Sequence, residues 1–398
     1  MFIGLVGKPS AGKSTFFRAL TLMDVACASY PFTTIKPNEG VGFFKVDCVD
    51  VELGKQCMPR EGYCVQHKRF VPVKVVDVAG LVPGAHEGKG LGLEFLNDLS
   101  QADALIHVVD ISGSLNERGE PVAPGSYDPA KDIEFLEHEL DMWYLGIFRK
   151  AWRHFTRTVY LTKENVVIAI AKQFSGLRVN EDLVKAQLTK LGLIDKLVTE
   201  WTDDELAALT RALRRETKPM LIAANKMDVP GADVKLKELK ERFPHLPIVP
   251  CSAESELVLK GASNKGLISY IPGEKDFTIP DAGKLSAEQG KALEFIRTRV
   301  LERFGSTGVQ ETLNAAVFTL LSYIAVFPGA VNNLVDSEGR TLPDCYLMPP
   351  RTTALDFAFK LHTDLGEHFI RAINVKTRMP IKKDRILAHR DVIEIVHD

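Results

Sequence analysis

Residues 7–15 read Gly7-Lys8-Pro9-Ser10-Ala11-Gly12-Lys13-Ser14-Thr15. The apolar run Phe2–Val6 precedes this stretch, and a helical pattern over Thr15–Leu20 follows it. A G-x-x-x-x-G-K-S sequence between a strand and a helix is typical of a P-loop, whose backbone N–H groups and helix N-terminus surround phosphate oxygens. We therefore expect a nucleoside triphosphate to be bound by Gly7, Ser10, Ala11, Gly12, Lys13, Ser14 and Thr15.

Two residues of this loop have separate tasks in the prediction. Lys13 supplies positive charge to the β and γ phosphates and so has a catalytic role, whereas the Ser14 hydroxyl binds Mg²⁺. Two later segments complete the metal site. Thr34, favoured over its neighbour Thr33, follows in an extended loop, and Asp77 ends the next apolar strand. The sequence therefore predicts a magnesium site formed by three separate segments.

The segment after Asp77 is relevant to hydrolysis. Gly80 can offer its N–H to the γ-phosphate, so we assign it a catalytic role. Ras-like proteins place a water-orienting glutamine next, whereas this chain has Leu81, which predicts slow intrinsic hydrolysis. His86, in the glycine-rich loop that follows, is the nearby proton acceptor at neutral pH and is a catalytic candidate. A solvated loop histidine is the interpretation that the sequence favours over this role.

The composition is that of a globular protein and sets limits on the function. The chain has 398 residues, 45% of them hydrophobic, and a net charge of −2, so no overall basic field attracts it to nucleic acid. No apolar run is long enough to span a membrane, and the first residues already read as a core strand without a leader. Six cysteines fit free thiols in a reducing cytoplasm.

Base recognition is predicted at Asn225-Lys226-Met227-Asp228, which follows the apolar strand Met220–Ala224. The Asp228 carboxylate can accept two hydrogen bonds from guanine, a donor pair that adenine lacks. Asn225 would hold the loop, and the Lys226 stem would cover the ring face. A last strand leads to Ser252 and Ala253, where a backbone N–H can contact guanine O6.

Between the two halves of the nucleotide domain lies a long helical insertion. Its apolar residues recur at helical spacing, and we expect Trp143 and Trp152 to pack inside it. Its basic residues are interpreted as solvated helix faces, with RNA contact as the alternative; they are Arg149, Lys150, Arg153, Arg214 and Arg215.

The C-terminal part changes to short strands around one helix, typical of a small α+β module. Its later half is locally basic, which favours either phosphate contact or a solvated face; the residues are Lys376, Arg378, Lys382, Lys383 and Arg385. The predicted domains are a nucleotide domain of residues 1–127 and 217–275, a helical insertion of 128–216, a helical linker of 276–324 and the C-terminal module of 325–398.

One cluster of possible metal ligands stands apart from these motifs. Cys48, Cys57, Cys64 and His67 lie close in sequence, but their spacing is not a standard zinc pattern. Free, partly buried thiols in a hairpin are the expectation, and zinc is the alternative.

The motifs at residues 7–15, 30–38, 77–81, 84–92 and 225–228 together resemble those of an Obg-superfamily GTPase, closest to the YchF-related group of archaea and eukaryotes. Residues 361–372 resemble a TGS domain, a ubiquitin-like β-grasp module. The resemblance implies a translation-linked GTPase that docks on ribosomes or RNA through its TGS domain and helical insertion. It also implies the class in which a hydrophobic residue, here Leu81, replaces the catalytic glutamine.

Two features separate this chain from some relatives. Certain YchF proteins lose the N-K-x-D motif and prefer ATP, whereas this chain retains Asp228. Relatives activated by K⁺ often have asparagine where this chain has Ser10, so potassium activation is not favoured.

The sequence thus predicts an α/β protein: a P-loop NTPase of the Ras-like G-domain type with a helical insertion and a C-terminal β-grasp (TGS) domain. The expected function is a nucleotide switch that binds GTP or GDP with Mg²⁺, hydrolyses GTP slowly, and acts with ribosomes or RNA. The alternatives are an ATPase of the same fold and a nucleotide-regulated RNA-binding adaptor with little turnover.

Overall fold

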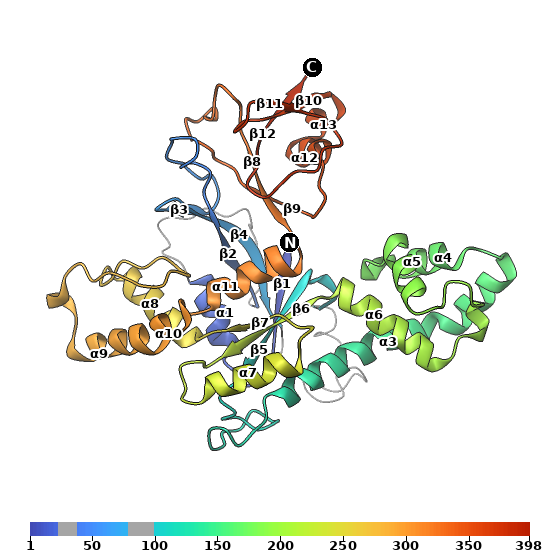
Figure 1. Cartoon of the computed structure of the whole chain (residues 1–398), viewed down its shortest axis with the longest axis horizontal. Coiled ribbons are helices and arrows are strands. Elements are labelled where there is room, and N and C mark those ends of the chain that lie inside the picture. The colour runs from blue at the N-terminus through green and yellow to red at the C-terminus, as the bar shows by residue number, and fades with distance from the viewer. Residues whose placement is uncertain (23–37, 79–98) are drawn as a thin grey trace. The chain divides into compact units, whose positions relative to one another are not determined.

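The computed structural model of the chain describes residues 1–22, 38–78 and 99–398. These residues form two compact units, each built from segments distant in sequence (Figure 1). The first unit comprises Met1–Ser14 and Val76–Val249, and the second comprises Thr15–Val75 and Pro250–Asp398. The domain boundaries expected from the sequence stay a prediction.

A β-sheet forms the centre of the first unit. Its strands are β1 (Phe2–Val6), β5 (Ala104–Asp110), β6 (Met220–Asn225), the last residues of β4 (Lys68–Asp77) and the first residues of β7 (Ile248–Pro250). They lie in the order β4-β1-β5-β6-β7. β5 is parallel to both β1 and β6, with Leu5 opposite Ile106 and His107 opposite Ile222.

The carboxyl ends of these strands define the edge where the predicted site lies. Every residue of β5 and β6 is buried, as expected for parallel strands covered on both faces. The P-loop directly follows β1, and Asp77, Asp110 and Asn225 are the last residues of β4, β5 and β6. In open α/β sheets, ligands bind beyond this edge.

Helices account for most of the remainder of the first unit. They are α3 (Ala130–Thr162), α4 (Val166–Gln173), α5 (Glu181–Lys190), α6 (Asp203–Thr217) and α7 (Ala232–Arg242), with short 3₁₀ turns at Ser175–Leu177 and Val198–Glu200. α6 begins with a capping box in which Thr202 and Glu205 satisfy each other's backbone N–H groups. Among the described helices, none is both long and apolar enough to cross a bilayer.

The interior of the helical insertion is aromatic, which confirms the packing prediction for its tryptophans. Trp143 is buried and meets Tyr144 edge to face, with ring centroids 6.0 Å apart. Trp152 packs against Phe155 and Trp201, with centroid distances of 5.3 and 5.5 Å.

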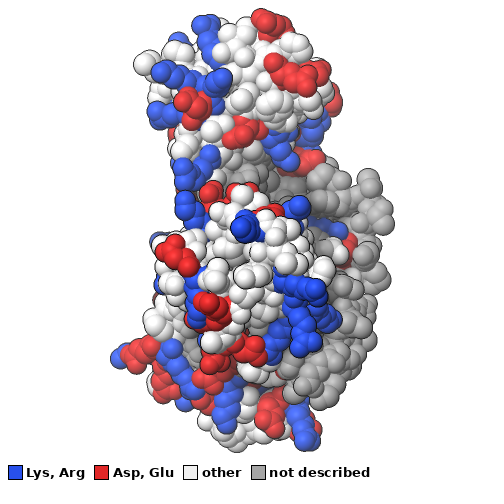
Figure 2. All heavy atoms as spheres, turned by 90° about the vertical axis from the view of Figure 1, so that its right-hand side faces the viewer, with Lys and Arg blue, Asp and Glu red and all other residues white. Residues whose placement is uncertain are grey.

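The interpretation of the basic residues as solvated helix faces was wrong for Arg214. Its side chain is only 2% exposed and pairs with Asp141 at 2.6 Å, so it ties α6 to α3. Arg149 and Arg215 are half exposed and pair with Asp203 and Glu137. The face drawn in Figure 2 likewise shows side chains of both charge signs next to one another.

The second unit contains a hairpin and a group of helices. β2 (Glu39–Asp47) and β3 (Tyr63–Val65) each pair with β4, and β3 and β4 are antiparallel. The helices are α1 (Lys13–Thr21), which begins in the first unit, α8 (Ala253–Asn264), α9 (Ala287–Ile296), α10 (Glu302–Phe304) and α11 (Val309–Asn314). Shorter segments join them: a 3₁₀ turn at Ala282–Lys284 and π-helical turns at Arg297–Leu301 and Ala315–Leu320.

A mixed five-stranded sheet ends the second unit and confirms the expected β-grasp module. Its strands are β8 (Ile324–Pro328), β9 (Tyr346–Met348), β10 (Phe369–Asn374), β11 (Met379–Ile381) and β12 (Val392–His397), in the order β11-β10-β12-β8-β9. β12 and β8 are parallel, whereas β10 is antiparallel to both β11 and β12, and β8 is antiparallel to β9. The helices are α12 (Ala354–Leu361) and α13 (Thr363–Glu367), and Phe357 of α12 packs with Val326, Ala372 and Ile393.

Candidate functional site

The glycines of the P-loop are required by close contacts within the first unit. A Cβ atom on Gly12 would lie 2.3 Å from Nδ2 of Asn225, and the φ of Gly12 is +93°. A Cβ atom on Gly7 would lie 2.6 Å from the carbonyl oxygen of Val108. Both positions therefore exclude any larger residue, and they bring the loop against the ends of β5 and β6. Ser10, at φ 63°, is exposed on the loop, and Ala11 is buried.

Lys13 and Ser14 meet Asp77 at the first turn of α1. The Lys13 ammonium forms an ion pair with Oδ1 of Asp77. The Ser14 hydroxyl lies 3.4 Å from Oδ2 of the same carboxylate. A hydroxyl and a carboxylate on one side are the hard oxygen ligands that Mg²⁺ prefers, so these residues fit the ion. The arrangement also gives Lys13 an anionic partner that a phosphate can replace.

The N-K-x-D loop is fastened to the P-loop and to β5. Asn225 donates a hydrogen bond from Nδ2 to the carbonyl oxygen of Ala11, at 3.0 Å. Lys226 has a left-handed backbone, with φ 66°, and its ammonium pairs with Oδ2 of Asp110 at 2.9 Å. Asp228 is half-buried in the turn that follows. The structure thus brings the predicted base-recognition and phosphate loops together.

Asp110 is a site residue that the sequence analysis did not assign. It is buried at the end of β5 and accepts hydrogen bonds from the hydroxyls of Ser112 and Ser114. Burial acts to raise the pKa of Asp110, but the hydrogen bonds from Ser112, Lys226 and Ser114 together lower it. The carboxylate is therefore ionised and holds Lys226 in place. In the sequence, only its position at the end of an apolar strand could have indicated that Asp110 belongs to the site.

Lys8 is the second residue that the sequence analysis missed. Its ammonium lies 2.8 Å from Oδ2 of Asp132 on α3, and both side chains are 8% exposed. It also donates to the carbonyl oxygen of Leu115 at 3.1 Å and lies 4.0 Å from the centroid of the Tyr127 ring. A buried lysine inside the P-loop thus joins that loop to the start of α3. Asp132 gave no signal, because an acid in a helix's first turn is commonplace.

A cavity of about 510 Å³ lies beside these residues. Its lining comes from the P-loop, β5, the segment between β5 and α3, and α3 itself, and it includes Lys8, Pro9, His107, Tyr127 and Asp132. Burial, followed by the charge of Lys8, lowers the pKa of His107 to about 3. His107 is therefore neutral near pH 7, and its Nδ1 has no hydrogen-bond partner within the described ranges.

Several predicted site residues are not brought into this arrangement. Thr34, Gly80, Leu81 and His86 lie outside the described residues, so their roles stay predictions. Thr15 lies in α1, at the start of the second unit.

Ser252 and Ala253 also belong to the second unit. The Ser252 hydroxyl caps α8 by accepting from the backbone N–H of Ser255, at 3.4 Å. Since that hydroxyl is engaged, a contact to a base would use the main chain, which stays a prediction.

Three family models match the chain. A 50S ribosome-binding GTPase model matches residues 2–140, the model of the G4 motif-containing domain of Obg-like, YGR210-like GTPases matches residues 223–331, and a TGS domain model matches residues 338–397.

Several relatives match nearly the whole of this chain. An uncharacterised GTP-binding protein of Methanocaldococcus jannaschii is 44% identical over 395 residues, which cover 99% of this chain and 98% of the relative. The crystal structure of a GTP-binding protein from Pyrococcus horikoshii has a TM-score of 0.79 and 39% identity, with full coverage of both chains. The ribosome-binding ATPase YchF of Bacillus subtilis is 25% identical and covers 94% of this chain and 87% of its own length.

Proposed function

Because this chain belongs to the Obg-like GTPases, in the YchF-related group with a C-terminal TGS domain, we propose that it is a GTP-hydrolysing switch with slow intrinsic turnover that acts on the ribosome. Relatives that match nearly the whole chain are named GTP-binding proteins. The choice of GTP over ATP, the hydrolysis and the ribosomal partner are the parts that need a test.

The preference for guanine is supported above all by the fastening of the N-K-x-D loop. Asn225 bonds to Ala11, and Lys226 bonds to Asp110, so the turn that presents Asp228 is held from both sides. A fixed carboxylate accepts from two guanine donors, whereas adenine would leave it without partners. Because the loop is already held in place, guanine binding does not have to meet the free-energy cost of ordering it.

The phosphate end of the site supports hydrolysis by positioning and charge. Lys13 and the Gly80 N–H would stabilise charge on the γ-phosphoryl group, and Ser14, Thr34 and Asp77 would hold Mg²⁺, which neutralises the phosphate oxygens. Leu81 cannot orient water, so intrinsic turnover is slow unless His86 or a partner completes the site. A ribosome that rearranges this region would raise the rate.

A docking surface for ribosomal RNA is supported by the β-grasp module. Arg378, Lys382, Lys383 and Arg385 are exposed on and after the β10–β11 hairpin, and within the described residues none of them forms an ion pair. Exposed basic side chains without an ion-pair partner can replace the counterions of an RNA backbone. The Bacillus subtilis relative is named a ribosome-binding protein. Such a partner would place the protein in the cytoplasm.

The first experiment compares GTP and ATP binding by calorimetry with Mg²⁺, on the wild type and on Asp228→Asn. We expect GTP to bind more tightly, and Asp228→Asn to weaken GTP by about 10–100-fold, the loss of hydrogen bonds to a charged group. Asp195→Asn, an exposed acid of the same unit, is the matched control and should change nothing. Equal or tighter ATP binding would instead favour the ATPase, the activity in the name of the Bacillus subtilis relative.

Co-sedimentation with ribosomes distinguishes a nucleotide switch from a nucleotide-regulated adaptor. The full chain should bind more tightly with a non-hydrolysable GTP analogue than with GDP. Lys382→Glu/Lys383→Glu should weaken that binding, whereas the charge reversal Lys237→Glu on α7 should not. Equal binding in both nucleotide states would reject the switch and leave an adaptor.

A further inference from the structure

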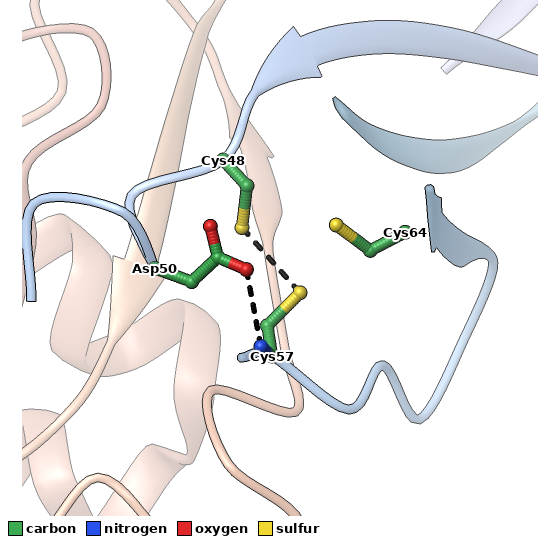
Figure 3. Close-up of side chains that lie close together, drawn as sticks. All are labelled: Cys48, Asp50, Cys57 and Cys64. Carbon is green, nitrogen blue, oxygen red and sulfur yellow. Dashed lines mark hydrogen bonds between the residues drawn. The ribbon is translucent and has the colours of Figure 1, made fainter. Parts of the chain in front are cut away.

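The second unit brings three cysteines and one aspartate to a common centre. Cys48 directly follows β2, Cys57 lies in the loop 48–62, and Cys64 is on β3 (Figure 3). One ligand atom from each of these residues and from Asp50 lies within 4.8 Å of the others. Cys48, Asp50 and Cys57 are buried, and Cys64 is partly buried. The sequence grouped His67 with the cysteines, whereas the structure places Asp50 among them.

We propose that Cys48, Asp50, Cys57 and Cys64 bind one zinc ion. Four ligands around one centre match the tetrahedral coordination of structural zinc sites. With zinc–sulfur bonds of about 2.3 Å, tetrahedral thiolates lie roughly 3.8 Å apart. The Sγ atoms of Cys48 and Cys57 are 3.5 Å apart, so small rotations of these side chains suffice. An iron–sulfur cluster, with several metal ions between its thiolates, needs a wider cage than 4.8 Å.

The surroundings of Asp50 are those of a positioned metal ligand. Its carboxylate is completely buried, and Oδ2 accepts a hydrogen bond from the backbone N–H of Cys57, at 3.1 Å. Oδ1 lies 3.1 Å from Nδ1 of His67, whose side chain is 46% exposed. The backbone N–H of Cys48 in turn donates to the carbonyl oxygen of His67, at 2.8 Å. Hydrogen bonds of this kind orient the ligands of metal sites.

A buried cation beside the group supplies an independent argument. Arg69 lies directly opposite Cys64 in the β3–β4 register and is 1% exposed. It donates to the carbonyl oxygens of Leu342 and Pro343, but its Nε has no hydrogen-bond partner, and Arg69 forms no ion pair with any described residue. A buried charge needs compensation. Zinc bound by three thiolates and one carboxylate has a net negative charge, which would compensate Arg69.

The ion would fix the loop on which the β-grasp module packs. Cys48 and Cys57 share a hydrophobic cluster with Phe327, Leu342 and Val375 of that module. The backbone N–H groups of Met58 and Arg60 bond to the carbonyl oxygens of Thr341 and Pro343. The loop between Cys48 and Cys64 has only the short strand β3 as regular structure, so one ion that joins both its ends would hold its shape.

The test measures metal in the full chain, purified without a histidine tag. We expect close to one zinc per chain by elemental analysis. Co²⁺ added to metal-free protein should give the intense visible bands of a tetrahedral thiolate site, and Zn²⁺ should bleach them. Cys57→Ser should lose at least tenfold in Zn²⁺ affinity. His67→Ala should lose roughly 10–100-fold as the orienting partner, while keeping the tetrahedral spectrum.

The controls separate this ligand set from its neighbours. Cys345→Ser changes a thiol that packs against the same cluster without belonging to the group, and should retain the zinc. GTP binding by Cys57→Ser shows that the variant is folded. A chain that binds no Zn²⁺ or Co²⁺, zinc retained by Cys57→Ser, zinc lost from Cys345→Ser, or bound iron with sulfide would each overturn the proposal. A Cys48–Cys57 disulfide found in the purified protein by mass spectrometry would do so as well.

Discussion

The ion pair between Lys8 and Asp132 allows a sharp test of how the P-loop is held. We consider Lys8→Met, which keeps the unbranched side chain as far as Cε and removes the ammonium and its charge. The change leaves Asp132 buried, with the Tyr127 hydroxyl at 2.8 Å as its remaining partner. Burial already raises the pKa of Asp132, against the opposing effect of Lys8, so the carboxylate depends strongly on that ammonium.

The expected magnitude follows from the cost of an unpaired buried charge. Removing one member of a buried ion pair costs about 3–5 kcal/mol. Replacing both members by apolar residues removes the desolvation cost together with the attraction, so Lys8→Met/Asp132→Leu should lie within roughly 1–2 kcal/mol of the wild type. Tyr127 is half exposed and can turn its hydroxyl to water. The two single changes should therefore be strongly non-additive.

Urea unfolding followed by tryptophan fluorescence measures this effect in the correct unit. All three tryptophans of the chain, Trp143, Trp152 and Trp201, lie in the first unit. Lys131→Met is the matched control, because Lys131 is exposed and should change stability by no more than about 0.5 kcal/mol. A loss below ~1 kcal/mol for Lys8→Met, or additive effects in the double variant, would refute the reasoning.

Three further predictions concern the same unit. Asp77→Asn should weaken the binding of GTP with Mg²⁺ and leave the binding of GDP in EDTA unchanged, because the carboxylate is assigned to the metal ion. Both affinities are measured by calorimetry, and equal losses in the two would contradict that role. Because the pKa of Asp110 is lower in the folded than in the unfolded state, its ionised form stabilises the fold above pH ~3.9, and this stability is lost as the pH falls through the folded-state pKa. Asp110→Asn should remove this acid dependence from the urea unfolding curves. An unchanged dependence of stability on pH would contradict the prediction. Arg214 and Arg211 both contact Asp141, but their side chains are 2% and 57% exposed. In urea unfolding, Arg214→Ala should therefore lower the free energy of unfolding by about 3–5 kcal/mol and Arg211→Ala by at most ~1 kcal/mol. Equal losses would show that burial does not set the contribution of these ion pairs to stability.

Much of the fold and of the nucleotide site is predictable because its signals are local. Gly7–Ser14 and Asn225–Asp228 are short motifs next to apolar strands, and their residue order alone indicates the chemistry. The helices from Ala130 to Thr217 follow from apolar spacing. The partners of single charges are not predictable in this way. Arg214 reads as part of a basic surface pair until α3 supplies Asp141.

By itself, the sequence determined that this chain has a P-loop, an N-K-x-D motif and a C-terminal β-grasp module, since each depends on residues close together in the chain. Only the tertiary structure decided that Lys8 reaches Asp132, that Asp110 holds Lys226, and that Asp50 joins the three cysteines while His67 turns to Asp50. These pairs depend on strand order and turn geometry, which bring distant side chains together. A buried charge then requires the partner that the fold has placed beside it.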